Sequence, residues 1–330
     1  MIDYPGPSKL DKAAFTEETR SGRPATGQAA LTSCRRPLWQ LPSPPQPSTA
    51  FPLCATWQRC RVHFIWGVVH DGEIAFPDAI STLDLLKSSG LDVCLLSNSP
   101  RRANQVAARL ECMGIDPSLY GHIITSGELV FEALGDACDD WHAALGRRYF
   151  HLGQPDLAGL LWGLDRIEVD LPRSADFIVN TGTNGRQTLD DLAMLLDECA
   201  LLDLPMICAN PDLVVVAGDQ TVLCAGTLAQ RYEVLGGTVR YHGKPHSPAY
   251  RHALDLLGHE RHEVLAVGDS LRTDVAGARN EGLDVVFIAS GIHRAELGCI
   301  KPGEFQLSRL QELLARQSDI PTFVARHFKW

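Results

Sequence analysis

The stretch VLAVGDSLRTDVAGARN, residues 264–280, joins an apolar run to a polar turn and then to a helical segment. The apolar residues from Val264 to Val267 predict a buried strand that ends at Gly268-Asp269. Asp274–Asn280 predicts a helix that is closed by Gly282. Because a buried strand that leads through a polar turn into a helix is typical of parallel sheets, this stretch indicates an α/β fold.

The same alternation continues on both sides of this stretch. Four further apolar runs predict strands, at Val62–Val69, Leu91–Leu96, His122–Thr125 and Val285–Ala289. Three segments with helical spacing of their apolar residues predict helices, at Pro77–Ser89, Arg101–Met113 and Glu128–Leu145. Strands and helices that alternate at this spacing indicate βαβ units and a parallel sheet.

The middle of the chain, residues 147–238, repeats the alternation. Its predicted strands are Ala175–Val179, Met206–Ala209 and Leu213–Val216, and its predicted helix is Thr188–Leu201. This pattern predicts a second α/β unit that is inserted between the early and late parts of the first. We therefore expect a core domain made of residues 61–146 and 239–330, and an inserted domain of residues 147–238.

Residues 1–60 differ in composition from the rest of the chain. They contain nine of the 20 prolines, and residues 1–62 carry a net charge of +4 against −14 for residues 63–330. The segment has neither a helix period nor a strand period, so we expect it to be disordered or loosely attached. Two alternatives stay open: a proline-rich ligand for a binding module at Pro42–Pro47, and an aberrant segment produced by a frameshift or a wrong start.

Composition argues against several classes of protein. The 330 residues are 45% hydrophobic, which suffices for a sizeable core, and the net charge of −10 argues against a surface for nucleic acid or anionic membrane. No apolar run approaches the length of about 18 residues that a membrane-spanning helix needs, and the N-terminus lacks a signal-peptide pattern. The ten cysteines form no CxxC pair, so we expect reduced thiols and a cytoplasmic protein.

Polar residues follow several of the predicted strands. Ser97 and Asn98 come directly after the strand Leu91–Leu96, and Asp269 follows Val264–Val267. Because ligands bind at the carboxyl ends of strands in open α/β sheets, we expect these residues to share a site. Asp269 and Asp274 lie five positions apart around a Gly-Asp-Ser turn, and carboxylate oxygens of this kind suit Mg²⁺.

Each of these residues also has a simpler interpretation. Ser97 could cap the helix that follows it, and Asp274 could cap the helix that it begins. Lys244, before another predicted helix, could be a solvated surface amine. The presence of all these elements in order favours a phosphate site over the separate explanations.

The order of these elements resembles the haloacid-dehalogenase superfamily of phosphatases. Ser97, Lys244 and the Gly-Asp-Ser-x-x-Thr-Asp sequence that begins at Gly268 look like motifs two, three and four of that superfamily. A finer resemblance, to the NagD-like subclass IIA, covers about residues 62–330 and is carried by WGVVHDG at 66–72, LSN at 96–98, TSGE at 125–128, NPD at 210–212, CAGT at 224–227, GKP at 243–245 and SGIHR at 290–294. The resemblance implies a Rossmann-like, doubly wound parallel sheet with an inserted α/β cap, and hydrolysis of a small phosphomonoester.

The resemblance also implies a role for each matching residue. Ser97, Asn98 and Lys244 would bind the transferring phosphoryl group, through hydrogen bonds and a point charge. Asp269 would bind Mg²⁺ directly, and Asp274 would support the metal or its water. Four residues of the cap would close over the leaving group and select it: Asn180, Gly182, Asn210 and Asp212.

One expected residue of the superfamily is missing. Phe64 stands where the family has the aspartate that attacks phosphorus, and Trp66 aligns with the general acid and base, while its backbone carbonyl would be a further metal ligand. An aromatic ring can neither attack phosphorus nor ligate magnesium, so we expect the activity of this chain to be impaired. Rescue by Asp71, seven positions beyond Phe64, would need the strand to slide and would lose the match at Trp66-Gly67.

Two functional hypotheses follow, and a third concerns the gene product itself. The first is a Mg²⁺-dependent phosphatase, by descent, with a defective motif one. The second is a pseudo-phosphatase that binds a phosphorylated metabolite or partner without turnover. The third is an unstable chain without function. The first hypothesis expects a small phosphorylated metabolite as the ligand, and neither nucleic acid nor a membrane as a partner. A homodimer is a further expectation, because dimers formed through the cap are common in the family that the chain resembles.

Overall fold

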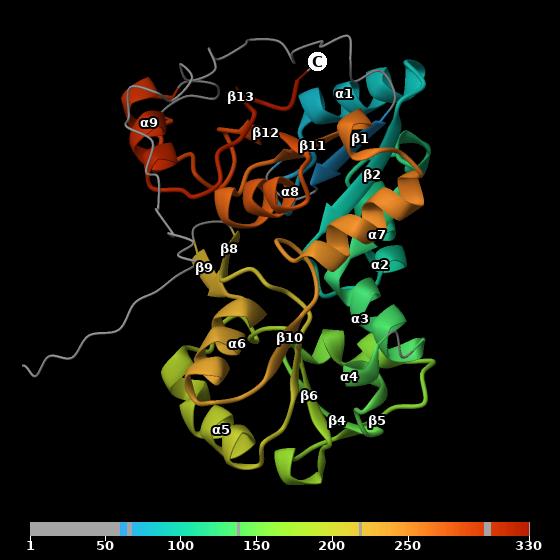
Figure 1. The fold of residues 1–330 in the computed structure, drawn as a ribbon, viewed down its shortest axis with the longest axis vertical. Coiled ribbons are helices and arrows are strands. Elements are labelled where there is room, and N and C mark those ends of the chain that lie inside the picture. The colour runs from blue at the N-terminus through green and yellow to red at the C-terminus, as the bar shows by residue number, and fades with distance from the viewer. Residues whose placement is uncertain (1–59, 65–67, 137–138, 218–219, 300–304, 330) are drawn as a thin grey trace, which may run out of the picture. The chain divides into compact units, whose positions relative to one another are not determined.

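The computed structural model describes residues 60–64, 68–136, 139–217, 220–299 and 305–329, which form two parallel sheets and their helices (Figure 1). The expectation for residues 1–60 therefore lies outside the described residues, apart from Cys60. The larger sheet has six strands in the order β13-β12-β11-β1-β2-β3. Their bounds are Cys60–Phe64 (β1), Asp92–Ser97 (β2), His122–Thr125 (β3), Val264–Gly268 (β11), Asp284–Ile288 (β12) and Phe323–Ala325 (β13).

Helices cover both faces of this six-stranded sheet, which makes it doubly wound. One face packs through Leu96 and Phe287 against α3, α7, α8 and α9, and the other packs through Leu95 and Val267 against α1 and α2. The bounds are Pro77–Ser88 (α1), Ala103–Cys112 (α2), Ser126–Gly135 (α3), Ser247–Leu257 (α7), Ala276–Asn280 (α8) and Leu307–Ala315 (α9). Burial on both faces explains why the strands are continuous apolar runs and do not alternate.

The second sheet has five strands in the order β10-β7-β6-β4-β5, and all its pairings are parallel. The strands are Arg148–Leu152 (β4), Ile167–Val169 (β5), Phe177–Asn180 (β6), Met206–Cys208 (β7) and Val239–Tyr241 (β10), with helices Leu189–Leu201 (α5) and Ala225–Val234 (α6). The predicted α/β class and the inserted second unit are thus confirmed. We call this sheet with its helices the cap and the six-stranded sheet with its helices the core.

The strand predicted at Leu213–Val216 is present as β8 (Val214–Ala217), which pairs with β9 (Gln220–Leu223) in an antiparallel hairpin. The structure corrects two other details of the predicted elements. β10 pairs with β7, so the chain leaves the cap after Tyr241 and not at residue 238. The helix predicted at Glu128–Leu145 is two helices, because Asp139 accepts a hydrogen bond from the His142 amide and begins α4 (Asp140–Ala143).

Short helical turns complete the connections. They are Pro117–Leu119 (η2), Pro155–Leu161 (η3), Pro172–Ser174 (η4), Arg261–Glu263 (η5) and the π-helical turn Leu271–Val275 (η6). Within the described part of the chain, no helix is both long enough and apolar enough to cross a membrane.

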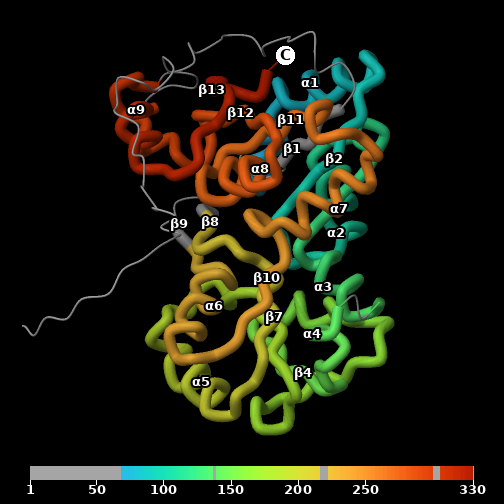
Figure 2. Tube along the Cα trace, in the orientation of Figure 1, coloured from blue at the N-terminus to red at the C-terminus, as the bar shows by residue number. Residues whose placement is uncertain are grey.

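Two histidines join the two chain segments that connect core and cap. The first connection runs through α4 and the second leads from β10 to α7 (Figure 2). His142 of α4 lies with its Nε2 atom 3.1 Å from Nε2 of His242, which follows β10. Burial, with the nearby His142 and Arg240, lowers the pKa of His242 to about 3, so its ring is neutral at physiological pH. One N–H···N hydrogen bond therefore links the two connections.

We predict that Phe287→Ala destabilises the protein by about 3–5 kcal/mol, because it removes a fully buried ring from a central strand and leaves a cavity. The free energy of unfolding in urea is the measurement. Leu201→Ala is the control, since that side chain is 88% exposed and its truncation should change little. Equal effects of the two substitutions would contradict the described core.

Candidate active site

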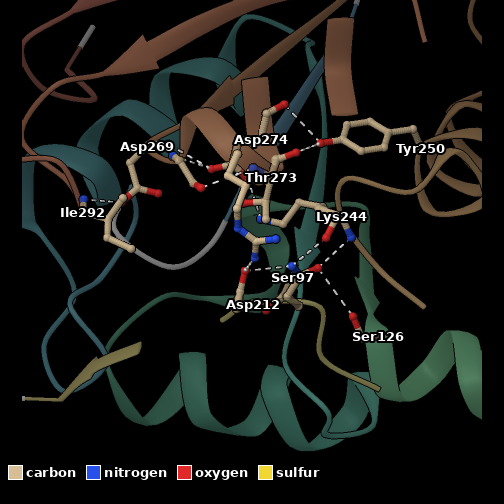
Figure 3. A network of polar contacts seen from close by, with 12 residues as sticks. Ser97, Ser126, Asp212, Lys244, Tyr250, Asp269, Thr273, Asp274 and Ile292 are labelled. Carbon is tan, nitrogen blue, oxygen red and sulfur yellow. Dashed lines mark hydrogen bonds and ion pairs between the residues drawn. The ribbon is translucent and has the colours of Figure 1, made fainter. Parts of the chain in front are cut away.

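The polar residues predicted from the sequence meet at the carboxyl ends of three neighbouring strands. Ser97 is the last residue of β2, and Asp269 directly follows β11. β1 lies between these two strands and ends at Phe64, which is in register with Leu96. Lys244 approaches the same place from the connection between β10 and α7 (Figure 3). Parallel pairing therefore brings together residues that are far apart in the sequence.

A buried ion pair lies at the centre of this group. Lys244 Nζ is 2.7 Å from Asp274 Oδ1, and both side chains are less than one-tenth exposed. The other carboxylate oxygen of Asp274 accepts hydrogen bonds from the backbone amides of Asp269 (2.9 Å) and Ser270 (3.0 Å). Asp274 is thus more than a helix cap, because it fixes both the lysine and the turn that carries Asp269.

Asp269 is held against a second loop. Its Oδ2 atom accepts a hydrogen bond of 2.8 Å from the backbone amide of Ile292. Gly268 and Gly291 allow this close packing, because a Cβ on either would lie 2.2 Å from the Cβ of Asp274 or Asp269. Burial, reinforced by the negative charge of Asp274, raises the pKa of Asp269. The site is therefore short of positive charge when no cation is bound.

Asn98 uses its side chain to position Lys244. Its Oδ1 accepts from the Lys244 amide at 2.7 Å, and its Nδ2 donates to the Lys244 carbonyl at 3.0 Å. The same Nδ2 donates to Asp212 Oδ1 at 3.0 Å. The side-chain amide of Asn98 is thus engaged by protein groups, and contact of Asn98 with a phosphoryl group stays a prediction. Ser97 is buried, and its Oγ accepts a hydrogen bond from the Ser99 amide at 3.1 Å.

Of the predicted cap residues, Asp212 contacts the core with its side chain, through its hydrogen bond to Asn98. Asn180 is fully buried inside the cap, where its Nδ2 donates to the Ala225 carbonyl and its Oδ1 accepts from the Gly182 amide. Asn210 accepts from the Asp212 amide with its Oδ1. These hydrogen bonds of Asn180 and Asn210 are made within the cap, and contact of Asn180, Gly182 and Asn210 with a ligand stays a prediction.

Two residues of the site were missed at the level of sequence. Tyr250 of α7 is buried, and its hydroxyl donates to the backbone carbonyls of Thr273 (3.0 Å) and Asp274 (3.1 Å), which supports the turn beneath the ion pair. Arg272 donates from Nη2 to the Pro211 carbonyl at 2.8 Å. Arg272 occupies a variable position of the motif, so its identity gave no signal, and Tyr250 reads as an ordinary core residue of an amphipathic helix.

The nucleophile position has no substitute among the described carboxylates near β1. Asp71 is exposed, and its Oδ1 accepts from the amides of Glu73 and Ile74, so it closes its own turn. These hydrogen bonds lower the pKa of Asp71. The proposed rescue by Asp71 therefore finds no support. Trp66 lies outside the described residues.

The oxygen atoms at the site are of the type that a hard cation binds, but Phe64 stands where one further carboxylate is expected. Asp269 offers an oxygen, Oδ1, that no described residue binds, whereas both oxygens of Asp274 are occupied by Lys244 and backbone amides. Oxygen donors of this type suit Mg²⁺. Phe64, at the end of the neighbouring strand, supplies none. In agreement, no group of three or more His, Cys, Asp or Glu side chains in the described chain could hold a metal ion.

Comparisons with known proteins place this arrangement among hydrolases. Three family models match: haloacid dehalogenase-like hydrolase over residues 64–165, a second model of that description over 181–282, and HAD-hydrolase-like over 241–328. The chain is 25% identical over 230 residues to ribonucleotide monophosphatase NagD of Escherichia coli K12, with coverage of 68% of this chain and 85% of that protein.

Two further similarities agree. Acid sugar phosphatase of Staphylococcus aureus USA300 is 25% identical over 236 residues, covering 70% of this chain and 86% of that protein. The crystal structure of a haloacid dehalogenase-like hydrolase from Brucella suis 1330 superposes with a TM-score of 0.67 at 30% identity, covering 83% of this chain and 97% of that one. Both comparisons extend across core and cap.

We predict that Asp269→Asn stabilises the metal-free protein at pH 8 and has little effect near pH 4. The raised pKa of Asp269 means that folding favours the protonated acid. Ionisation therefore costs stability as the pH rises above the ordinary aspartate range, and the neutral amide avoids this cost. Urea unfolding in EDTA measures the difference, which should exceed about 1 kcal/mol.

Asp255→Asn is the matched control, because Asp255 is an exposed residue of α7. It should show no comparable dependence on pH. A lower stability of Asp269→Asn at pH 8, relative to the parent chain, would contradict the argument.

Proposed function

Because this chain belongs to the haloacid-dehalogenase superfamily, in the NagD-like subclass IIA of phosphoric monoester hydrolases, we propose that its site binds the phosphoryl group of a small phosphorylated metabolite together with Mg²⁺. We further propose that hydrolysis is impaired because Phe64 replaces the attacking aspartate. The observation that carries the proposal is the convergence of Ser97, Lys244 and Asp269 around the end of β1.

The proposed binding step uses groups that are already fixed. Lys244 would supply a positive charge to the phosphoryl oxygens, and the Ser97 hydroxyl would donate a hydrogen bond to them. Asp274 holds the lysine in place through the 2.7 Å ion pair, so little reorganisation is needed when the ligand binds. Asn98 fixes the lysine backbone from the other side.

Mg²⁺ would neutralise phosphoryl charge and orient the group when it is bound. Asp269 would hold the cation with the oxygen that is left free, with Asp274 supporting from behind. The raised pKa of Asp269 supports this role, because a buried carboxylate beside a second one is stabilised by a nearby cation. Phe64 leaves the metal site incomplete, so we expect Mg²⁺ to bind more weakly here than in a site with the aspartate.

We also propose domain boundaries and a location for the protein. We propose a core of residues 61–146 with the segment after β10, and a cap between them, supported by the pairing of β10 with β7. Six described cysteines have free thiols, which supports a reducing, cytoplasmic location. A homodimer is proposed from the family resemblance alone.

We predict that Phe64→Asp raises turnover of p-nitrophenyl phosphate by at least about 10³-fold, since loss of a nucleophile elsewhere has cost on the order of 10⁶. The carboxylate would be both nucleophile and metal ligand at the end of β1. Phe64→Asn is the matched control, because it has nearly the same shape but cannot attack phosphorus. A folded Phe64→Asp protein that is no faster than Phe64→Asn would refute descent from this mechanism.

The absence of a carboxylate at Phe64 favours a second candidate function, binding without turnover. For this pseudo-phosphatase we predict that the unaltered chain binds inorganic phosphate in the presence of Mg²⁺, as measured by calorimetry. Lys244→Met should weaken binding by at least about tenfold, because it removes the charge that faces the phosphoryl group. Lys329→Met is the control, since Lys329 is an exposed lysine that pairs with Asp78. No heat of binding by the folded chain would exclude this function.

A further inference from the structure

The cap turn Asn210–Asp212 contacts the core on two sides of the phosphate site. Asn98, next to Ser97, donates to Asp212 Oδ1 at 3.0 Å. Arg272, within the turn that carries Asp269 and Asp274, donates to the Pro211 carbonyl at 2.8 Å. The turn is thus held by one residue from each of the two core loops that form the site.

The turn is fixed to the cap and moves with it. The Asp212 amide donates to Asn210 Oδ1 at 3.0 Å, and the Gly226 amide donates to the Asp212 carbonyl at 3.1 Å. Gly226 lies in the first turn of α6, and a Cβ there would lie 2.4 Å from the Pro211 carbonyl oxygen. A displacement of the cap must therefore break the contacts of Arg272 and Asn98 to this turn.

Arg272 is fixed to the core at its backbone and half-exposed at its side chain. It lies in the π-helical turn η6, whose next residues are held by Tyr250 and by the amide contacts of Asp274. Its guanidinium is 3.9 Å from the Asp212 carboxylate, and the two side chains are 42% and 37% exposed. Such a pair contributes little by charge alone, so the hydrogen bond to Pro211 carries the contact.

We propose that Arg272 is a positioning residue that holds the cap turn Asn210–Asp212 over the phosphate site. The charge-assisted hydrogen bond to Pro211 keeps the turn docked, and the attraction to Asp212 orients the guanidinium. Loss of Arg272 would leave Asn98 as the remaining described side-chain contact from core to turn. The proposal deepens the function proposed above and rests on it only for the identity of the ligand beneath the turn.

Hydrogen–deuterium exchange of the full, ligand-free chain tests the docking directly. In Arg272→Met we expect the backbone amides of Asn210, Asp212 and Leu213 to exchange about tenfold faster than in the parent chain; Pro211 has no amide hydrogen. If these amides exchange in Arg272→Met at the same rate as in the parent chain, the proposal is overturned. Because no phosphate or metal is present, this result is independent of whether the chain binds or hydrolyses a phosphomonoester.

Arg101→Met is the matched control. Arg101 also reaches from the core to the cap, where its Nη2 lies 2.6 Å from Asp156 Oδ2 in an exposed pair. Its loss should leave exchange at residues 210–213 unchanged. Equal acceleration in both variants would mean a general loosening of the cap and would overturn the specific role of Arg272.

A conservative variant separates positioning from simple destabilisation. Arg272→Lys keeps the positive charge and can still donate a hydrogen bond, so it should restore part of the protection of residues 210–213. It is also the variant to measure if Arg272→Met does not fold. An alternative role for Arg272 is direct contact with an anionic ligand. In that case Arg272→Met would weaken phosphate binding without accelerating exchange in the ligand-free chain, and this pattern would also overturn the proposal.

Discussion

The ion pair between Lys244 and Asp274 organises everything else in the site. The two residues lie 30 positions apart, on different loops, and both are buried. A buried charge pair is stable only when further hydrogen bonds support its groups. The backbone amides of Asp269 and Ser270 donate hydrogen bonds to one carboxylate oxygen of Asp274, and the Asn98 side chain accepts one from the Lys244 amide. The pair therefore joins motifs two, three and four into one rigid unit.

The aspartate that the family resemblance leads one to expect is absent at Phe64, but the strand that carries this position is regular. Phe64 ends a strand that pairs in regular register with both neighbours, so the frame that would present an aspartate is intact. Ser97, Lys244 and Asp269 still converge at the end of this strand, and burial beside Asp274 raises the pKa of Asp269. In the function that we propose, the strand supplies the position, and the side chain at its end decides whether an attack on phosphorus can occur.

The cap contributes to the site through one turn. Asp212 and the Pro211 carbonyl meet core residues from motif two and motif four, whereas Asn180 and Gly182 serve the internal structure of the cap. The cap and the site are therefore coupled through these two partly buried hydrogen bonds. In the function that we propose, so few contacts suit a cap that must release as well as retain its ligand.

The sequence by itself determined the α/β class, the insertion of a second unit, the family, and the residues Ser97, Lys244, Asp269 and Asp274, because apolar runs, turn residues and motif spacing are local properties. It could not assign β10 to the cap sheet, since that strand is three residues long and its partner β7 is distant in sequence. It could not show that the side-chain amides of Asn98 and Asn180 bind backbone groups, because an amide that binds a ligand and one that binds a backbone look alike in sequence. Only the tertiary structure decided the roles of Tyr250 and Arg272. Each side chain donates a hydrogen bond to a backbone carbonyl, and because every residue has a carbonyl, the sequence does not show which one a side chain reaches.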